Sequence, residues 1–176
     1  TSVGLNCRVF GGGVELLDEL PSGPGCILLD LRMPVMSGQQ VLEQLDGRID
    51  VPPVIMMSGV GEVDDAVRAM KAGAFDYLEK PPHPSKLIDA VQRAVAASVE
   101  RQPMLETMRQ RQARLDALTQ QEREVMRLIV AGHPNKGIAR TLGLSQRTVE
   151  FHRGRLMRKM NAANVAELVR MVLAPP

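Results

Sequence analysis

The sequence predicts an α/β domain with a parallel sheet, followed by an all-α domain that contains a helix-turn-helix arrangement. The first half alternates short apolar stretches with stretches at helical spacing, which is typical of βα units. The second half carries helical patterns only. The halves also differ in charge: residues 1–98 hold 8 Lys and Arg against 13 Asp and Glu, and residues 99–176 hold 14 against 7. An acidic domain followed by a basic one predicts that the second domain faces a polyanion.

Four short apolar stretches of the first half are expected to be strands. They are residues 5–10, 26–30, 54–57 and 75–79. Helices are expected at 14–20, 37–47, 62–73 and 85–98, which together with the strands complete a domain over 1–98. Ser37 is a predicted N-cap. Two of these helices show an apolar face, made in one case by Val41, Leu42 and Leu45 and in the other by Val63, Val67 and Met70.

Residues 99–118 are predicted to form a polar linker helix. Pro103 interrupts the start of the stretch, and apolar residues then recur near heptad spacing until Arg111 falls where the next one would continue it. This pattern favours a solvated connector over a coiled coil. The apolar positions are Met104, Met108, Leu115 and Leu118.

The third segment, 119–176, reads as four helices. Thr119 and Glu122 form a capping box that opens a helix ending near Gly132. A short helix at 135–142 and a Gly-containing turn precede a long basic helix, which Ser145 caps and which carries Val149, Leu156 and Met160 toward the core. A last helix spans 164–173. A short helix, a turn and a longer basic helix form a helix-turn-helix arrangement.

Three polar residues follow the expected strands of the sheet: Asp30, Ser58 and Lys80. The carboxyl ends of parallel strands open into the crevice where such sheets bind ligands, and a carboxylate there can act as a nucleophile toward a phosphoryl group. The alternative interpretation is that Asp30 only marks where its strand enters solvent.

At this point the sequence resembles a known family. Asp30, Met33-Pro34, Gly38, Ser58 and Lys80-Pro81 are similar to the receiver domain of bacterial response regulators, which has a flavodoxin-like fold. The segment LTQQEREVMRLIVAGHPNKGIARTLGLSQRTVEFHRGRLMRKM resembles the LuxR-type DNA-binding domain. The order of the two domains, together with MKAGAFDYLEKP, resembles response regulators of the NarL/FixJ type.

The resemblance implies roles for five residues of the first domain. Asp30 would accept the phosphoryl group, Lys80 and Ser58 would contact its oxygens, and the ring of Tyr77 would change rotamer. The main-chain carbonyl of Arg32 would bind Mg²⁺ together with Asp30. The Lys80-Pro81 bond is expected to be cis.

One family feature is missing. Receivers begin with a strand that ends in an acidic pair for Mg²⁺, whereas here Glu15, Asp18 and Glu19 lie on the first expected helix. The acids Glu62, Asp64 and Asp65 fit the first turn of a helix instead. Either the chain lacks its natural amino terminus or the receiver is degraded. Both cases predict a sheet with a gap, weakened or lost Mg²⁺ binding, and slow or absent phosphorylation.

In the basic half the resemblance implies contacts with double-stranded DNA. Glu150, Phe151 and Gly154 would face base edges, because Glu can accept from cytosine and Phe can touch a thymine methyl. Four residues would approach phosphates: Lys136, Arg147, Thr148 and Arg155. Arg158 and Lys159 are further cations of the predicted DNA-binding set.

The sequence therefore predicts a transcription regulator rather than an enzyme. A sensor histidine kinase would phosphorylate Asp30 and so control homodimer formation and DNA binding, with RNA polymerase as a further partner. Two alternatives remain: a phosphorylation-independent DNA-binding regulator, and a phosphate-handling enzyme with an adaptor domain. Apolar runs too short to cross a bilayer, the lack of a secretion signal, and Cys7 and Cys26 without metal-ligand spacing predict a cytoplasmic protein without membrane contact.

Overall fold

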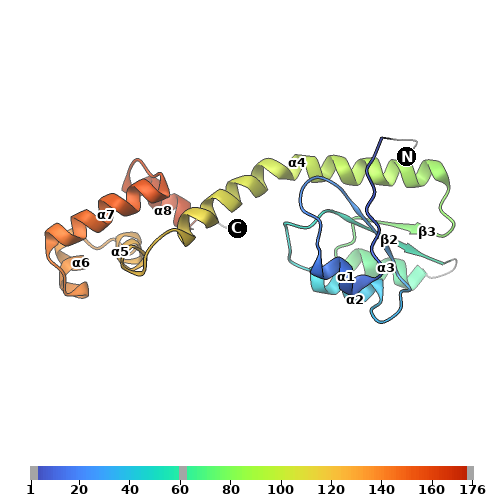
Figure 1. Ribbon diagram of the computed structural model, residues 1–176, viewed down its shortest axis with the longest axis horizontal. Helices are drawn as coiled ribbons and strands as arrows, with labels where there is room; N and C mark the ends of the chain where they lie inside the picture. Colours follow the sequence, from blue (N-terminus) through green and yellow to red (C-terminus); the bar gives the residue numbers. More distant parts are fainter. Residues whose placement is uncertain (1–3, 60–62, 174–176) are drawn as a thin grey trace. The chain divides into compact units, whose positions relative to one another are not determined.

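The computed structural model describes residues 4–59 and 63–173. The chain divides into two compact units, one ending at Leu105 and the other beginning at Glu106. The first unit combines helices with strands and the second is helical (Figure 1). The predicted fold class, a parallel α/β domain followed by an all-α domain, is confirmed. No helix among the described residues is long and apolar enough to cross a membrane.

The first unit is built on a three-stranded parallel sheet in the order β1-β2-β3. The bounds of each strand differ by at most one residue from those of an expected stretch. The agreement is close because an apolar run between turn residues is a local signal. Three helices connect the strands or precede the first. The elements are α1 (Gly13–Asp18), β1 (Ile27–Asp30), α2 (Gly38–Leu45), β2 (Val54–Ser58), α3 (Val63–Lys71) and β3 (Asp76–Glu79).

The two faces of this sheet pack against different helices. Leu29 and Met56 belong to a buried cluster that includes Val41 of α2, whereas Ile55 packs with Ala90 of α4 (Pro84–Asp116). In Figure 1 the beginning of α4 lies on the opposite side of the sheet from α1 and α2. Because helices cover both faces, the strands read as nearly continuous apolar runs.

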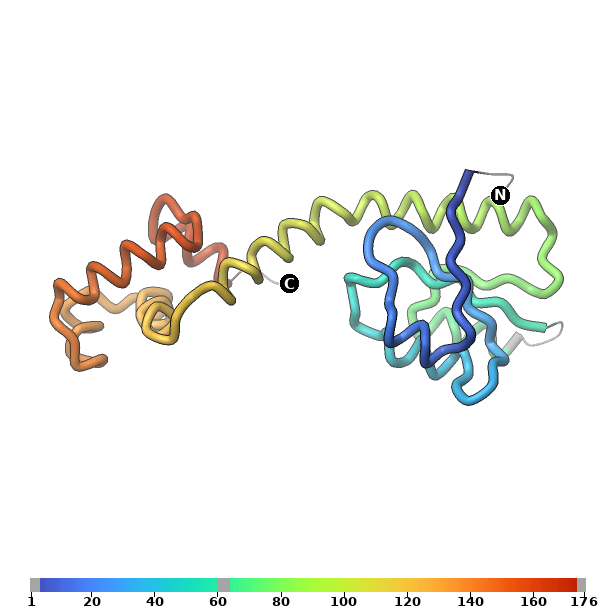
Figure 2. The backbone as a smooth tube through the Cα atoms, viewed as in Figure 1, coloured from blue at the N-terminus to red at the C-terminus, as the bar shows by residue number. Residues whose placement is uncertain are grey.

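Residues 5–10, which were expected to form a strand, form none. The stretch is extended in Figure 2 (dark blue), but it pairs with no strand among the described residues. In the strand order implied by the family, this stretch would pair only with the strand that carries the acidic pair. Among the described residues, β1 pairs only with β2, and Leu28 of β1 is 43% exposed.

Residues 99–116 of the predicted linker helix are helical, but they do not form a separate helix. α4 continues from the first unit through this stretch to Asp116, with Pro103 inside it. Proline removes one backbone donor and disfavours a helix interior. Helical residues on both sides nevertheless continue the same helix, and the Gln102 side chain donates a hydrogen bond to the carbonyl of Ser98 at 3.3 Å.

The predicted apolar face of α3 is also wrong in part. Val67 is 47% exposed and Met70 is 49% exposed, whereas Ala69 is fully buried. α3 therefore packs through a small residue, and the larger side chains lie outside that contact. The side chain of Val63 and all of Glu62 lie outside the described residues.

The second unit packs four helices and the end of α4 around one core. The helices are α5 (Gln120–Val130), α6 (Asn135–Leu142), α7 (Gln146–Met160) and α8 (Val165–Leu173). Val149, Leu156 and Met160 are fully buried, as predicted. The last turns of α4 contact this core: Leu115 packs against it, and Arg114 donates to the carbonyl of Met160 at 3.4 Å. The predicted linker therefore belongs in part to the second unit.

Candidate functional site

Asp30, Ser58 and Lys80 lie together at the carboxyl ends of the three strands. Asp30 ends β1, Ser58 ends β2, and Lys80 follows β3. The ammonium of Lys80 donates to the Asp30 carboxylate, and the backbone N–H of Lys80 donates to the Ser58 carbonyl at 2.7 Å. Parallel pairing brings these residues together, although they are separated by whole βα units in the sequence.

The Asp30 carboxylate is partly open to solvent. The Asp30 side chain is 35% exposed and that of Lys80 is 38% exposed. The backbone N–H of Arg32 donates to Asp30 Oδ1 at 3.2 Å, so the carboxylate has two donors. An exposed carboxylate beside a cation has the accessibility and the electropositive neighbour that a nucleophile toward a phosphoryl group requires.

The remaining residues of the predicted set stand nearby. Ser58 is buried, with 1% of its surface exposed. Tyr77 lies in the middle of β3, pairs with Met56 and is half-buried. The Lys80-Pro81 peptide bond is cis, as the family resemblance predicted.

Gly38 sets the position of the Asp30 backbone. Its N–H donates to the carbonyl of Leu31 at 2.9 Å. A Cβ at position 38 would stand 2.3 Å from the Asp30 carbonyl oxygen, which is far inside van der Waals contact. Ser37 caps α2 as predicted, and Gln40 completes a capping box that the sequence reading did not include.

The loop between β1 and α2 contains one strained residue. Val35 has a φ of 68° and is 97% exposed. A β-branched side chain in this left-handed region is unfavourable by roughly 1–2 kcal/mol, whereas glycine adopts it freely.

Val35→Gly should therefore stabilise the first unit by about 1 kcal/mol, since the exposed side chain contributes little burial. The only tyrosine of the sequence, which has no tryptophan, is Tyr77 in β3. Urea unfolding followed by tyrosine fluorescence thus reports on this unit. Val35→Ala, which keeps a Cβ, is the matched control. A Val35→Gly chain no more stable than the Val35→Ala chain would contradict the assignment of strain.

The described residues do not by themselves fit a Mg²⁺ site. No group of three or more His, Cys, Asp or Glu able to hold a metal occurs in 4–59 or 63–173. Two other acids of the first unit are engaged elsewhere: Glu19 pairs with Arg8, and Asp65 pairs with Arg68. Asp30 therefore has Lys80 as its charged partner, and neither of these acids joins it.

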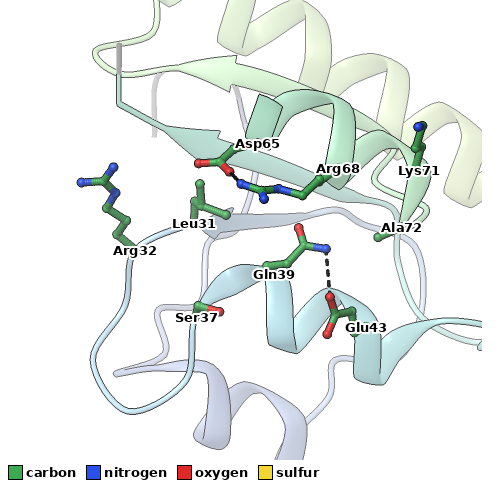
Figure 3. A pocket seen from close by; sticks show the side chains of 9 residues that line it. All are labelled: Leu31, Arg32, Ser37, Gln39, Glu43, Asp65, Arg68, Lys71 and Ala72. Atoms are coloured by element: carbon green, nitrogen blue, oxygen red, sulfur yellow. Dashed lines mark hydrogen bonds and ion pairs between the residues drawn. The ribbon is translucent and has the colours of Figure 1, made fainter. Parts of the chain in front are cut away.

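A groove of about 720 Å³ lies between α2 and α3, with Arg32 at one end (Figure 3). Figure 3 shows a hydrogen bond from Gln39 to Glu43 on one wall and the ion pair between Asp65 and Arg68 on the other. Asp30 and its strand-end partners do not line this groove. It is therefore a neighbour of the strand-end crevice rather than part of it.

In the second unit, α6 and α7 form the predicted helix-turn-helix. Gly143 ends α6 in the left-handed conformation, and the Ser145 hydroxyl accepts from the N–H of Thr148 at 3.1 Å to cap α7. Arg153 donates to Asn135 Oδ1 at 2.8 Å and ties the two helices together. The relative position of α6 and α7 is thus held by caps, a side-chain hydrogen bond and the shared core.

One face of α7 is open to solvent and basic. Phe151 is 58% exposed there, and the Arg155 guanidinium lies 5.6 Å from the centre of its ring. Thr148 is only partly exposed, and Lys136 on α6 is exposed. Most of the residues predicted to contact DNA therefore share an accessible surface opposite the core. The exposed residues of α7 in this set are Arg147, Glu150, Phe151, Gly154, Arg155 and Arg158.

Lys159 is the exception, and it belongs to a cluster that the sequence reading missed. Its ammonium donates to Glu122 Oε2 at 2.6 Å and to the carbonyl of Ala117 at 2.9 Å. Arg155 Nε lies 3.4 Å from Glu122 Oε1. The capping box of Thr119 and Glu122 is confirmed, but its sequence signal says nothing of a second partner on α7.

The Glu122 side chain is only 1% exposed. Burial alone would raise its pKa, but the hydrogen bonds from Lys159 and from Thr119 outweigh burial and lower the pKa from 4.5 to about 2. The Glu122 carboxylate is thus a buried charge with charged and neutral donors around it.

Comparisons with known proteins match both units. Residues 1–92 match the response regulator receiver domain, and residues 116–172 match the bacterial regulatory proteins of the luxR family. The chain is 43% identical over 173 residues to the C4-dicarboxylate transport transcriptional regulatory protein DctR of Rhodobacter capsulatus, covering 97% of this chain and 88% of that one. It is 44% identical over 151 residues to the transcriptional regulatory protein FixJ of Rhizobium meliloti, covering 85% and 74%.

Among solved structures, the response regulator StyR, determined at low resolution, shares 37% sequence identity with the chain. Its TM-score is 0.67, and the match covers 97% of this chain and 87% of that one. Both the receiver and the luxR-family matches fall on the units found in the structure, in the order that the sequence predicted. The chain therefore belongs to the two-component, DNA-binding transcriptional response regulators of the NarL/FixJ type, which join a receiver domain to a LuxR-type helix-turn-helix domain and are not enzymes.

Proposed function

We propose that Asp30 is the phosphoacceptor of this regulator and that a sensor histidine kinase is the donor. The observation that supports this is the contact of the Asp30 carboxylate, at the end of β1, with Lys80, directly after β3, beside the buried Ser58 at the end of β2. A carboxylate oxygen of Asp30 attacks the phosphorus, and the bond from phosphorus to the donor breaks. Lys80 then pairs with phosphoryl oxygens, and the Ser58 hydroxyl donates to another of them.

The response to phosphorylation is a change in assembly and DNA binding. Reorientation of Ser58 and Tyr77 changes the surface next to β3 and favours a receiver homodimer. A dimer presents two copies of α7 to paired half-sites on DNA, with α8 as a second contact between protomers. RNA polymerase in the cytoplasm is a further partner of the bound dimer.

The DNA contacts are proposed on the exposed face of α7. Glu150, Phe151 and Gly154 face base edges in the major groove. Cations and one hydroxyl group beside them approach phosphates, which fix the orientation of the helix. These groups are Lys136, Arg147, Thr148, Arg155 and Arg158. Lys159 belongs to the same predicted set, but its ammonium is engaged inside the domain.

Gly154→Ala tests this surface, because it should affect stability and DNA binding in opposite directions. A Cβ at position 154 would have no atom within 4 Å in the free protein, and alanine is favoured over glycine in a helix interior by about 1 kcal/mol. The variant should therefore unfold at a higher temperature and bind duplex DNA more weakly, because the Cβ stands where the backbone approaches the groove. Thermal unfolding by circular dichroism and fluorescence anisotropy measure the two effects.

Gly137→Ala on α6 is the control for this test, since its Cβ would meet only ordinary contacts at 3.5 Å or more. A Gly154→Ala chain that binds DNA as tightly as the parent would place the interface elsewhere.

A second candidate is a regulator whose DNA binding does not depend on phosphorylation. The lack of a metal-binding cluster among the described residues favours it, because the receiver would then serve dimer formation alone. Affinity for duplex DNA, measured before and after incubation with a small phosphodonor, separates the two. A change that is absent in Asp30→Asn supports the first, and an unchanged affinity supports the second.

A further inference from the structure

Three helix ends meet at the Glu122 carboxylate. The carboxylate lies in the first turn of α5 and accepts from the N–H of Thr119 at 2.8 Å. From α7, Lys159 and Arg155 approach its two oxygens at 2.6 and 3.4 Å. Lys159 also donates to the carbonyl of Ala117, directly after the end of α4. All these residues belong to the second unit.

Lys159 is held away from the exposed face of its helix. Two of its three N–H donors are used, one on Glu122 and one on Ala117, and its side chain is only 28% exposed. A contact with a DNA phosphate would require both bonds to break. It would also leave the buried carboxylate without its nearest cation, which is costly.

Arg155 is held differently. Its Nε lies 3.4 Å from Glu122 Oε1, and its side chain remains 45% exposed. The guanidinium lies beside the Phe151 ring, 5.6 Å from its centre, and so next to the proposed base-reading face.

We propose that Glu122 is a positioning residue for DNA binding that acts through Lys159: it retains this cation inside the domain, whereas Arg155 on the same helix remains open to a DNA phosphate. The inference rests on the proposed contact of α7 with DNA. It divides the predicted cations into one that contacts phosphate and one that does not.

The salt dependence of DNA binding separates these two roles. Each phosphate contact contributes about 0.9 to the slope of log affinity against log salt concentration. The probe is a fluorescent mixed-sequence duplex of about 30 base pairs, titrated with the full chain at several salt concentrations. Arg155→Met should reduce the slope by about 0.9, and Lys159→Met should leave it unchanged.

Removal of the Glu122 charge should allow Lys159 to contact a DNA phosphate and so contribute to the salt slope. Glu122→Gln keeps a capping-box side chain but no longer holds the ammonium. The slope of this variant should exceed that of the parent by up to about 0.9, and the double variant Glu122→Gln/Lys159→Met should return to the parent value. Lys159→Met should therefore leave the salt slope unchanged in the parent and reduce it in the Glu122→Gln background. A purely structural role of Lys159 would not produce this difference.

Two controls make the result decisive. Lys136→Met, at an exposed cation of α6, should reduce the slope as Arg155→Met does. Circular dichroism checks that each variant is folded. If Lys159→Met does not fold, the double variant, which lacks both charges, is compared with Glu122→Gln in its place. Equal reductions by Lys159→Met in both backgrounds would overturn the inference and leave DNA binding intact. A parent chain without salt-dependent binding would overturn the proposed DNA contact itself.

Discussion

Gly38→Ala should destabilise the receiver unit by about 1–3 kcal/mol, because extra volume in a closely packed place forces the backbone to move. The added Cβ would stand 2.3 Å from the Asp30 carbonyl oxygen and 3.0 Å from Met56 Cε. The side chain of Met56 can shift, but the backbone of β1 can move only by weakening its pairing with β2. Asp30 would be displaced from Lys80, so the variant should also accept phosphate less readily.

Urea unfolding followed by the fluorescence of Tyr77 measures this effect in the unit where it arises. Gly25→Ala is the matched control, since a Cβ there would have no atom within 4 Å and the residue does not require a positive φ. If Gly38→Ala and Gly25→Ala unfold at the same urea concentration, the close approach to Asp30 is not a feature of the folded protein.

The second large effect is a loss of stability in acid that depends on Glu122. The pKa of this group is lower in the folded protein, at about 2, than its ordinary value of 4.5. Ionisation therefore favours the folded state. The stabilisation is fully present above pH 4.5 and is lost as the pH falls toward 2. Protonation also removes the partner of Lys159, and breaking a buried ion pair is unfavourable by roughly 3 kcal/mol.

Glu122→Gln should be less stable than the parent at pH 7 and should lose less additional stability between pH 5 and pH 2. Urea unfolding by circular dichroism at each pH gives both differences. Glu124→Gln is the control, because Glu124 is on the same helix with a side chain 45% exposed. The stability of Glu124→Gln should change with pH as that of the parent does. Identical pH profiles for Glu122→Gln and the parent would show that Glu122 is not held ionised by Lys159.

Local patterns predicted much of this fold. The three strands, the caps at Ser37, Thr119 and Ser145, and the buried face of α7 all depend on residues close together in the sequence. Asp30, Ser58 and Lys80 were predicted as a set because parallel strands place their carboxyl ends at one edge. The structure brings Asp30 to Lys80, as that reasoning requires.

Errors arose where a residue depends on a distant partner. Residues 5–10 have a strand-like composition, but a strand requires a neighbouring strand, and none is present among the described residues. α4 runs through Pro103 although the local signal predicted an interruption. Lys159 resembles a surface cation in the sequence, and only tertiary packing reveals its contact with Glu122.

The assignment of Asp30 as the phosphoacceptor is tested most directly by measuring the mass of the intact chain. The chain and Asp30→Asn are each incubated with acetyl phosphate, with Mg²⁺ and with a chelator, and measured by mass spectrometry. We expect the parent to gain one phosphoryl group slowly. Asp30→Asn should gain none. An increment of the same size in Asp30→Asn would contradict the assignment of Asp30.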